Sequence, residues 1–197
     1  MRIVGILLAG GRGVRFGGAK LLAPLAADDA GWGTTVGVAA CRRLMAACPE
    51  VIAVVRPDDG DLAAALRETG ARVVACPRAD EGMGASLACG VAAAADADGW
   101  VVALADMPWI APATIAGIIA ALGRGAAAAA PFHRGERGHP VGFGKACGPA
   151  LAALTGDEGA RRVVAAQGDR LVRIDVDDVG AVRDVDTPSD LRQGAGE

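Results

Sequence analysis

Cations and glycines gather in the stretch LLAGGRGVRFGGAKLL, residues 7–22, near the start of the chain. Glycines let backbone N–H groups approach an anion closely. Arg15 can grip phosphate oxygens with its forked guanidinium, and Lys20 can act as a point charge. The stretch therefore predicts a phosphate-binding loop, with a flexible surface loop carrying solvated cations as the alternative.

This loop departs from both common phosphate-binding patterns. The pattern G-x-G-x-x-G fits Gly11 and Gly13 but has Phe16 where the third glycine belongs. The pattern G-x-x-x-x-G-K-[ST] fits Gly13 and Gly18 but has Ala19 where the lysine belongs. In each pattern the mismatch falls on a residue that phosphate binding by that loop requires, so a loop of another type is expected.

Aspartates at two places could hold a metal ion. Asp106, in LADMP, follows an apolar run, where an aspartate is costly unless it is paired, solvated or metal-bound. Mg²⁺ typically takes one or two carboxylates together with substrate phosphates. The segment RDVDTPSDL offers Asp184, Asp186 and Asp190 as a second ligand. Strand alternation would place the first two on one face, before a helix that begins at 187–188. A capping or turn role is the alternative at both places.

Three further segments carry polar groups that could contact a substrate. In EGMGASLACG, backbone amides and Ser86 near a helix start could read a base edge or contact phosphate, unless Ser86 is an ordinary helix residue. His139 lies beside Pro140 in a loop, where a histidine is more often structural but could position a substrate. In TGDEGARRVV, Asp157 can cap the following helix.

The elements that must position these residues alternate along the chain. We expect strands at 2–9, 51–55, 71–76, 100–105 and 170–176, of which 2–9 and 100–105 are apolar enough to be buried. We expect helices at 36–48, 58–68, 84–95, 112–122, 148–154 and 159–167. Residues 125–132 are ambiguous, because alanine favours helix while the flanking glycine and proline favour a strand. The alternation predicts an α/β fold with a mostly parallel sheet. Ligands bind at the carboxyl ends of such strands, where the candidate residues lie.

Composition narrows the class of protein. The 197 residues suggest one domain at 1–193 with a short tail, and the net charge of -3 gives no reason to expect a nucleic-acid partner. The apolar segment 99–123 is better explained by a strand, a loop and a helix than by a membrane span. The five cysteines include no CxxC pair and predict buried thiols in a reducing compartment. We expect a cytoplasmic protein without a membrane partner.

These motifs, in this order, resemble the MobA-like nucleotidyltransferase superfamily. Within it the chain is most similar to the molybdenum cofactor cytidylyltransferases, and the resemblance covers nearly the whole length. The matching segments are 8–11, 15–17, 20–22, 82–90, 104–108, 138–141, 156–161 and 184–191. The resemblance implies a Rossmann-like three-layer sandwich of the nucleotide-diphospho-sugar transferase type.

The resemblance also implies a role for each candidate residue. Those that would bind the nucleotide are Ala9, Gly10, Gly11, Arg12, Arg15, Lys20, Gly82 and Ser86. Those that would lie near the acceptor are His139, Pro140, Asp157 and Arg161. Asp106 and Asp186 would hold Mg²⁺, and catalysis would rest on Lys20, Arg15 and Asp106. The implied reaction moves CMP from CTP to the phosphate of molybdopterin or the molybdenum cofactor and releases pyrophosphate.

One departure from the cytidylyl pattern keeps other functions open. The chain has Ala9-Gly10-Gly11, whereas the cytidylyl branch usually has two alanines and one glycine, and the double glycine is more typical of the guanylyl branch. GTP, or a different phosphorylated acceptor, is therefore an alternative. A non-catalytic nucleotide-binding factor that matures a molybdoenzyme, with that enzyme or a chaperone as its partner, is a third reading. An oxidoreductase acting on an aromatic substrate is a fourth.

Overall fold

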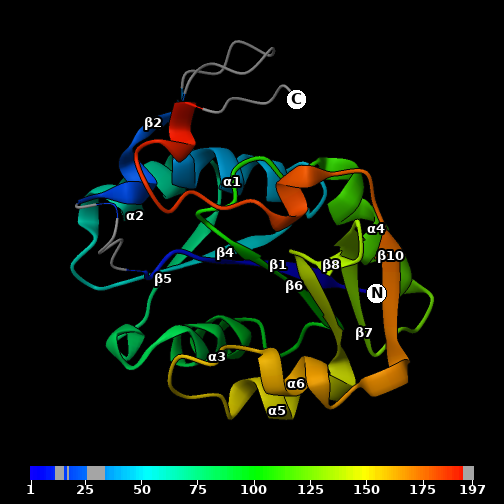
Figure 1. Ribbon diagram of the computed structural model, residues 1–197. Coiled ribbons are helices and arrows are strands. Elements are labelled where there is room, and N and C mark those ends of the chain that lie inside the picture. Colours follow the sequence, from blue (N-terminus) through cyan, green and yellow to red (C-terminus); the bar gives the residue numbers. More distant parts are fainter. Residues whose placement is uncertain (12–15, 17, 26–33, 193–197) are drawn as a thin grey trace.

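A central β-sheet organises the molecule (Figure 1). The computed structural model describes residues 1–11, 16, 18–25 and 34–192. In these residues the sheet has eight strands in the order β10-β7-β9-β6-β1-β4-β5, with β8 paired to β7. Their bounds are β1 Ile3–Leu8, β4 Val51–Val55, β5 Arg72–Ala75, β6 Gly99–Leu104, β7 Ala128–His133, β8 Glu136–Arg137, β9 Val141–Gly144 and β10 Leu171–Asp175. A separate ribbon joins β2 (Pro24–Leu25) to β3 (Thr34–Thr35).

Most neighbouring strands of the sheet are parallel. β1 pairs in parallel with β4 on one side and with β6 on the other. β4 also pairs in parallel with β5, and β7 pairs in parallel with β10. β9 is antiparallel to β6 and β7, between which it lies. The central strands β1 and β4 are apolar and almost wholly buried, as expected where helices cover both faces of a parallel sheet. The predicted α/β class is confirmed.

Helices form a layer on each face of the sheet (Figure 1). One layer holds α1 (Val36–Met45), α2 (Gly60–Glu68) and α4 (Pro112–Gly123), and the other holds α3 (Met83–Ala93), α5 (Gly148–Ala152) and α6 (Arg161–Ala165). Leu44, Leu62 and Ile115 belong to the apolar core of the first layer. Leu87 and Leu151 belong to the core of the second. The arrangement is the expected three-layer sandwich.

Short 3₁₀ helices shape the connections between these elements. They are η2 Lys20–Leu22, η3 Ala79–Glu81, η4 Lys145–Cys147, η5 Gly168–Arg170, η6 Val179–Val182 and η7 Asp190–Arg192. No helix of the described residues is long and apolar enough to cross a membrane. Segment 99–123 forms β6, a turn and α4, as predicted. All five cysteines are free thiols, and four of them are buried.

The structure resolves one ambiguous segment as a strand and differs from the prediction at another. Residues 128–130 are alanines, yet they are fully buried in β7 between β9 and β10, so sheet packing overrides the helical preference of alanine. Residues 184–186 form no strand, and the helix predicted at 187–188 is replaced by a turn before η7. The reason is that 184–186 docks on a loop: the Val185 N–H donates to the Asp106 carbonyl oxygen at 2.8 Å.

Candidate active site

Three carboxylates meet beyond the end of β6. One oxygen from each of Asp106, Asp184 and Asp186 lies within 4.8 Å of the others. Val185 is fully buried and its N–H is bonded to the Asp106 carbonyl, so the two flanking aspartates are directed away from the core. The predicted same-face placement of residues 184 and 186 therefore arises without a strand.

Lys20 lies inside this acidic cluster. Its Nζ is 2.8 Å from Asp106 Oδ2 and 3.5 Å from Asp186 Oδ1. The Lys20 side chain is only 11% exposed, because η2 holds it against the sheet edge. The ammonium group thus sits between the two residues predicted to hold a metal ion.

The electrostatics of the cluster favour a bound cation. Partial desolvation, followed by repulsion from Asp186 and Asp106, raises the pKa of the Asp184 carboxyl above its usual value. Three carboxylates offer hard oxygen ligands of the kind that Mg²⁺ and Mn²⁺ prefer. The Lys20 ammonium already places one positive charge among these carboxylates. The donor set fits a divalent metal.

Asp190 has a different role from its neighbours. Its Oδ2 accepts hydrogen bonds from the backbone N–H groups of Asp186 (3.0 Å) and Thr187 (2.6 Å). Bonds to Thr187 hold the pKa of the Asp190 carboxyl below its usual value. Asp190 therefore shapes the turn that carries Asp186, and the capping alternative considered from the sequence applies to it.

A cavity of about 470 Å³ opens beside the acidic cluster. It lies at the carboxyl ends of β1 and β6 and at the amino end of α3. Its walls bring together residues predicted from separate motifs: Gly10, Gly11, Lys20, Gly82, Ser86 and Asp106. Ala9 is buried just before this loop, and its N–H donates to the Val54 carbonyl at 2.9 Å. Arg12 and Arg15 lie outside the described residues.

Gly82 joins the start of α3 to a distant loop. Its φ of +121° and ψ of -173° form a conformation that residues with side chains rarely adopt. A Cβ atom there would lie 2.6 Å from the carbonyl carbon of Gly156. The neighbouring Gly84 N–H donates to the Gly156 oxygen at 2.7 Å. Asp157, predicted on the acceptor side, consequently lines the same cavity as Ser86.

The other predicted acceptor residues lie outside this lining. Among the described residues, those that line the cavity do not include His139, Pro140 or Arg161. His139 is half-buried, and its Nδ1 is buried without a hydrogen-bond partner in the described structure. Desolvation lowers the pKa of His139, although a hydrogen bond to the Val102 backbone acts in the opposite direction. Asp106 and Arg161 are close enough to perturb that pKa. The proposed position of His139 near the acceptor stays a prediction.

The lowered pKa of His139 makes the stability of the protein depend on pH. Because the pKa of His139 is lower in the folded than in the unfolded state, the unfolded chain binds a proton first as the pH falls. We expect His139 to contribute a loss of up to about 1.4 kcal/mol of unfolding free energy per pH unit below about pH 6.5. Urea unfolding of wild type and His139→Gln between about pH 7 and pH 5 measures this contribution. Equal slopes for the two proteins would contradict it.

Arg56 is a site residue that the sequence reading missed. It follows β4, is only 6% exposed, and pairs with Asp58 Oδ1 at 3.1 Å and Asp80 Oδ1 at 2.5 Å. It lines the main cavity and also a second cavity of about 390 Å³. The available signal was its position directly after the buried run VIAVV, at the same sheet edge as the other candidates.

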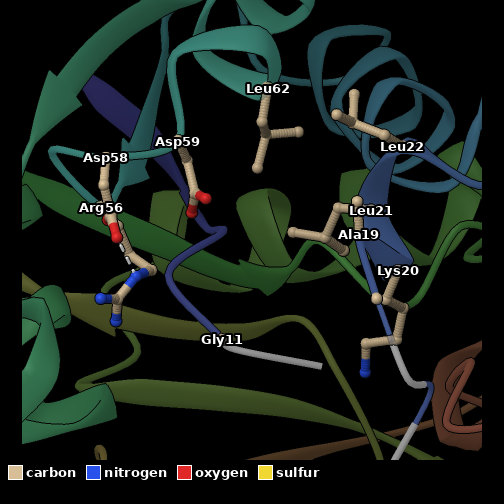
Figure 2. Close-up of a pocket in the computed structure, with 10 residues that line it drawn as sticks. Gly11, Ala19, Lys20, Leu21, Leu22, Arg56, Asp58, Asp59 and Leu62 are labelled. Atoms are coloured by element: carbon tan, nitrogen blue, oxygen red, sulfur yellow. Dashed lines mark hydrogen bonds and ion pairs between the residues drawn. The ribbon is translucent and has the colours of Figure 1, made fainter. Parts of the chain in front are cut away.

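The two cavities adjoin, because four residues line both of them. They share Gly11, Lys20, Leu21 and Arg56. Figure 2 shows Arg56 and Lys20 on opposite sides of Gly11, with Asp58 turned toward the guanidinium. A glycine backbone flanked by two cations provides a place for an anionic group.

A known protein family and two characterised proteins match this chain over most of its length. The family described as MobA-like NTP transferase domain matches residues 5–171. The purine catabolism protein PucB of Bacillus subtilis is 31% identical over 202 residues, covering 95% of this chain and 93% of that protein. Nicotine blue oxidoreductase of Paenarthrobacter nicotinovorans is 31% identical over 193 residues, covering 94% and 92%.

Solved structures extend the similarity to three dimensions. Rv0371c of Mycobacterium tuberculosis is 31% identical, with a TM-score of 0.83 and coverage of 98% of this chain and 96% of that one. A manganese complex of Rv0371c gives 29% identity, a TM-score of 0.78 and coverage of 98% and 97%. A nucleotidyl transferase from Methanothermobacter gives 27% identity, a TM-score of 0.80 and coverage of 98% and 95%.

Proposed function

This chain belongs to the MobA-like NTP transferase family and is a nucleotidyltransferase, and from that premise we propose that it transfers CMP from CTP to a molybdopterin-type acceptor. In this reaction an oxygen of the acceptor phosphate forms a bond to the α-phosphorus. The bond from that phosphorus to the β-phosphate bridging oxygen breaks, and pyrophosphate leaves. The acceptor phosphate is already ionised, so neither a protein nucleophile nor a strong general base is required.

The observation that carries this proposal is the position of Lys20. Its ammonium lies between Asp106 and Asp186 and also lines the cavity formed by Gly10 and Gly11. Asp106 and Asp186 would hold Mg²⁺, which would supply charge neutralisation on the triphosphate; the manganese complex of Rv0371c supports a divalent metal in such a protein. Positioning and charge neutralisation carry most of the catalysis in phosphoryl transfer.

Cytidine is proposed as the base in spite of the double glycine. A Cβ atom at Gly10 would lie 3.2 Å from Ser86 Oγ, which is closer than a comfortable contact. The close approach of Ser86 accounts for a glycine at position 10, so Gly10 need not reflect the identity of the base. The segments around Ser86, Lys20-Leu21-Leu22 and Gly138-His139-Pro140 resemble the cytidylyl branch.

A nucleotide screen tests the proposal. We expect CTP with Mg²⁺ at about 100 times its Kd to stabilise the fold by about 2.7 kcal/mol, or roughly 5–10 °C in melting temperature, and ATP, GTP and UTP to do less. Pyrophosphate release should require CTP, the acceptor and Mg²⁺ together. Preferential stabilisation by GTP would favour the guanylyl alternative. Binding of CTP without pyrophosphate release, across molybdopterin-type acceptors, would favour the non-catalytic maturation factor.

A further inference from the structure

Lys20 contacts both carboxylates that are predicted to hold the metal ion. We propose that the Lys20 ammonium is an internal counter-ion that metal displaces only when a triphosphate is present to receive it, so that metal and nucleotide bind cooperatively. This inference rests on the proposed function, because it assumes a nucleotide and a divalent cation at the Asp106–Asp186 pair. It concerns binding alone and requires no knowledge of the acceptor.

The contacts of Lys20 place its positive charge where it would compete with a metal ion for the same carboxylates. Lys20 Nζ is 2.8 Å from Asp106 Oδ2, within hydrogen-bond distance, and 3.5 Å from Asp186 Oδ1. A magnesium ion binds carboxylate oxygens at about 2.0–2.1 Å. An ammonium and a dication on one oxygen would repel each other strongly at such separations. This repulsion favours movement of the Lys20 ammonium away from Asp106 when the metal binds.

Moving the Lys20 ammonium away from the carboxylates is unfavourable when no other anion is near. The Lys20 side chain is largely buried, so an ammonium without an acidic partner would lose a charge-assisted hydrogen bond and gain little water. Metal alone must compete against this internal ion pair. Asp106, Asp184 and Asp186 repel one another in the absence of metal, and the Lys20 charge stabilises the cluster by reducing this repulsion.

A triphosphate changes this balance by offering new acceptors. Lys20 lines the main cavity with Gly10 and Gly11, and its four-carbon stem can reorient the ammonium toward phosphate oxygens there. Arg56 differs, because Asp58 and Asp80 already hold its guanidinium in place on the cavity wall. Binding coupling is reciprocal, so metal should raise nucleotide affinity by the same factor by which nucleotide raises metal affinity.

Manganese binding to the nucleotide-free protein tests this exchange of the Lys20 ammonium for a metal ion at the carboxylates. The free Mn²⁺ signal in electron paramagnetic resonance would be titrated with wild type and Lys20→Met, which keeps the length of the side chain and removes its charge. We expect Lys20→Met to bind Mn²⁺ alone about tenfold or more tightly than wild type. With the Mn²⁺ bound by CTP alone subtracted, CTP should tighten Mn²⁺ binding to wild type about tenfold, and CTP at a concentration that saturates Lys20→Met should change the value for that variant little.

Controls separate this effect from a general change of charge or fold. Lys145→Met removes the same charge from an exposed lysine on η4 and should leave Mn²⁺ affinity unchanged. Lys20→Gln repeats the test if the methionine variant fails to fold. Adding Asp106→Asn to Lys20→Met should abolish the gain. Weaker or unchanged Mn²⁺ binding in folded Lys20→Met or Lys20→Gln would overturn the inference.

The outcomes also distinguish this inference from the proposed function. If GTP, and not CTP, produces the cooperative tightening in wild type, the cytidylyl assignment fails and the exchange stands. If CTP tightens Mn²⁺ binding equally in wild type and Lys20→Met, the exchange fails while nucleotide and metal binding stand.

Discussion

Asp106→Asn is expected to lower the rate of nucleotidyl transfer by about 10²–10³-fold while the protein remains folded. Asp106 contacts Lys20 directly and lies at the centre of the acidic cluster and at the end of the main cavity. An amide keeps the shape of the side chain but removes the charge that would hold Mg²⁺. The backbone carbonyl that accepts from Val185 is unchanged, so the docking of segment 184–186 should survive.

The measurement is pyrophosphate release with saturating nucleotide, Mg²⁺ and acceptor. Asp169→Asn is the matched control, because residue 169 precedes β10 and lies at the opposite edge of the sheet from Asp106. It should retain the wild-type rate. Normal turnover of Asp106→Asn at ordinary Mg²⁺ concentrations would show that this carboxylate has no part in holding the metal.

Gly82→Ala is expected to lower the free energy of unfolding by about 2–4 kcal/mol and to weaken nucleotide binding. Alanine is strained at the φ of +121° found there, and its methyl group would lie 2.6 Å from the Gly156 carbonyl. Relief requires the 156–157 loop to move away from α3, which would break the bond from the Gly84 N–H to that same carbonyl. Both segments line the cavity, so its shape must change.

Thermal unfolding with and without CTP measures both effects. A loss of 2–4 kcal/mol corresponds to a fall of roughly 4–16 °C in a protein of this size. Gly117→Ala is the control: it lies within α4, a Cβ there would be 3.8 Å from Ile174, and alanine favours helix by about 1 kcal/mol over glycine. Gly117→Ala should leave stability equal or raised. A wild-type melting temperature for Gly82→Ala would refute the assigned role of Gly82.

The fold could be anticipated because its local signals agree with its global arrangement. Apolar runs such as residues 51–55 and 99–104 are buried on both faces, which is why their sequences show no alternation. Where local and tertiary preferences conflict, the sequence was ambiguous or misleading. The alanines of β7 were ambiguous, and residues 184–186 dock on the loop after β6 without forming a strand.

The residues able to do chemistry, and the end of the strands at which they would lie, could be identified from the amino-acid pattern alone. Glycines, a lysine and an aspartate each follow a buried strand, and carboxyl ends of parallel strands share one edge. Their pairing could not be identified in this way, because ion pairs depend on distances between segments that are remote in the chain and that the fold brings together. The fold placed Lys20 between Asp106 and Asp186, brought Asp157 against Gly82, and buried Arg56 between Asp58 and Asp80.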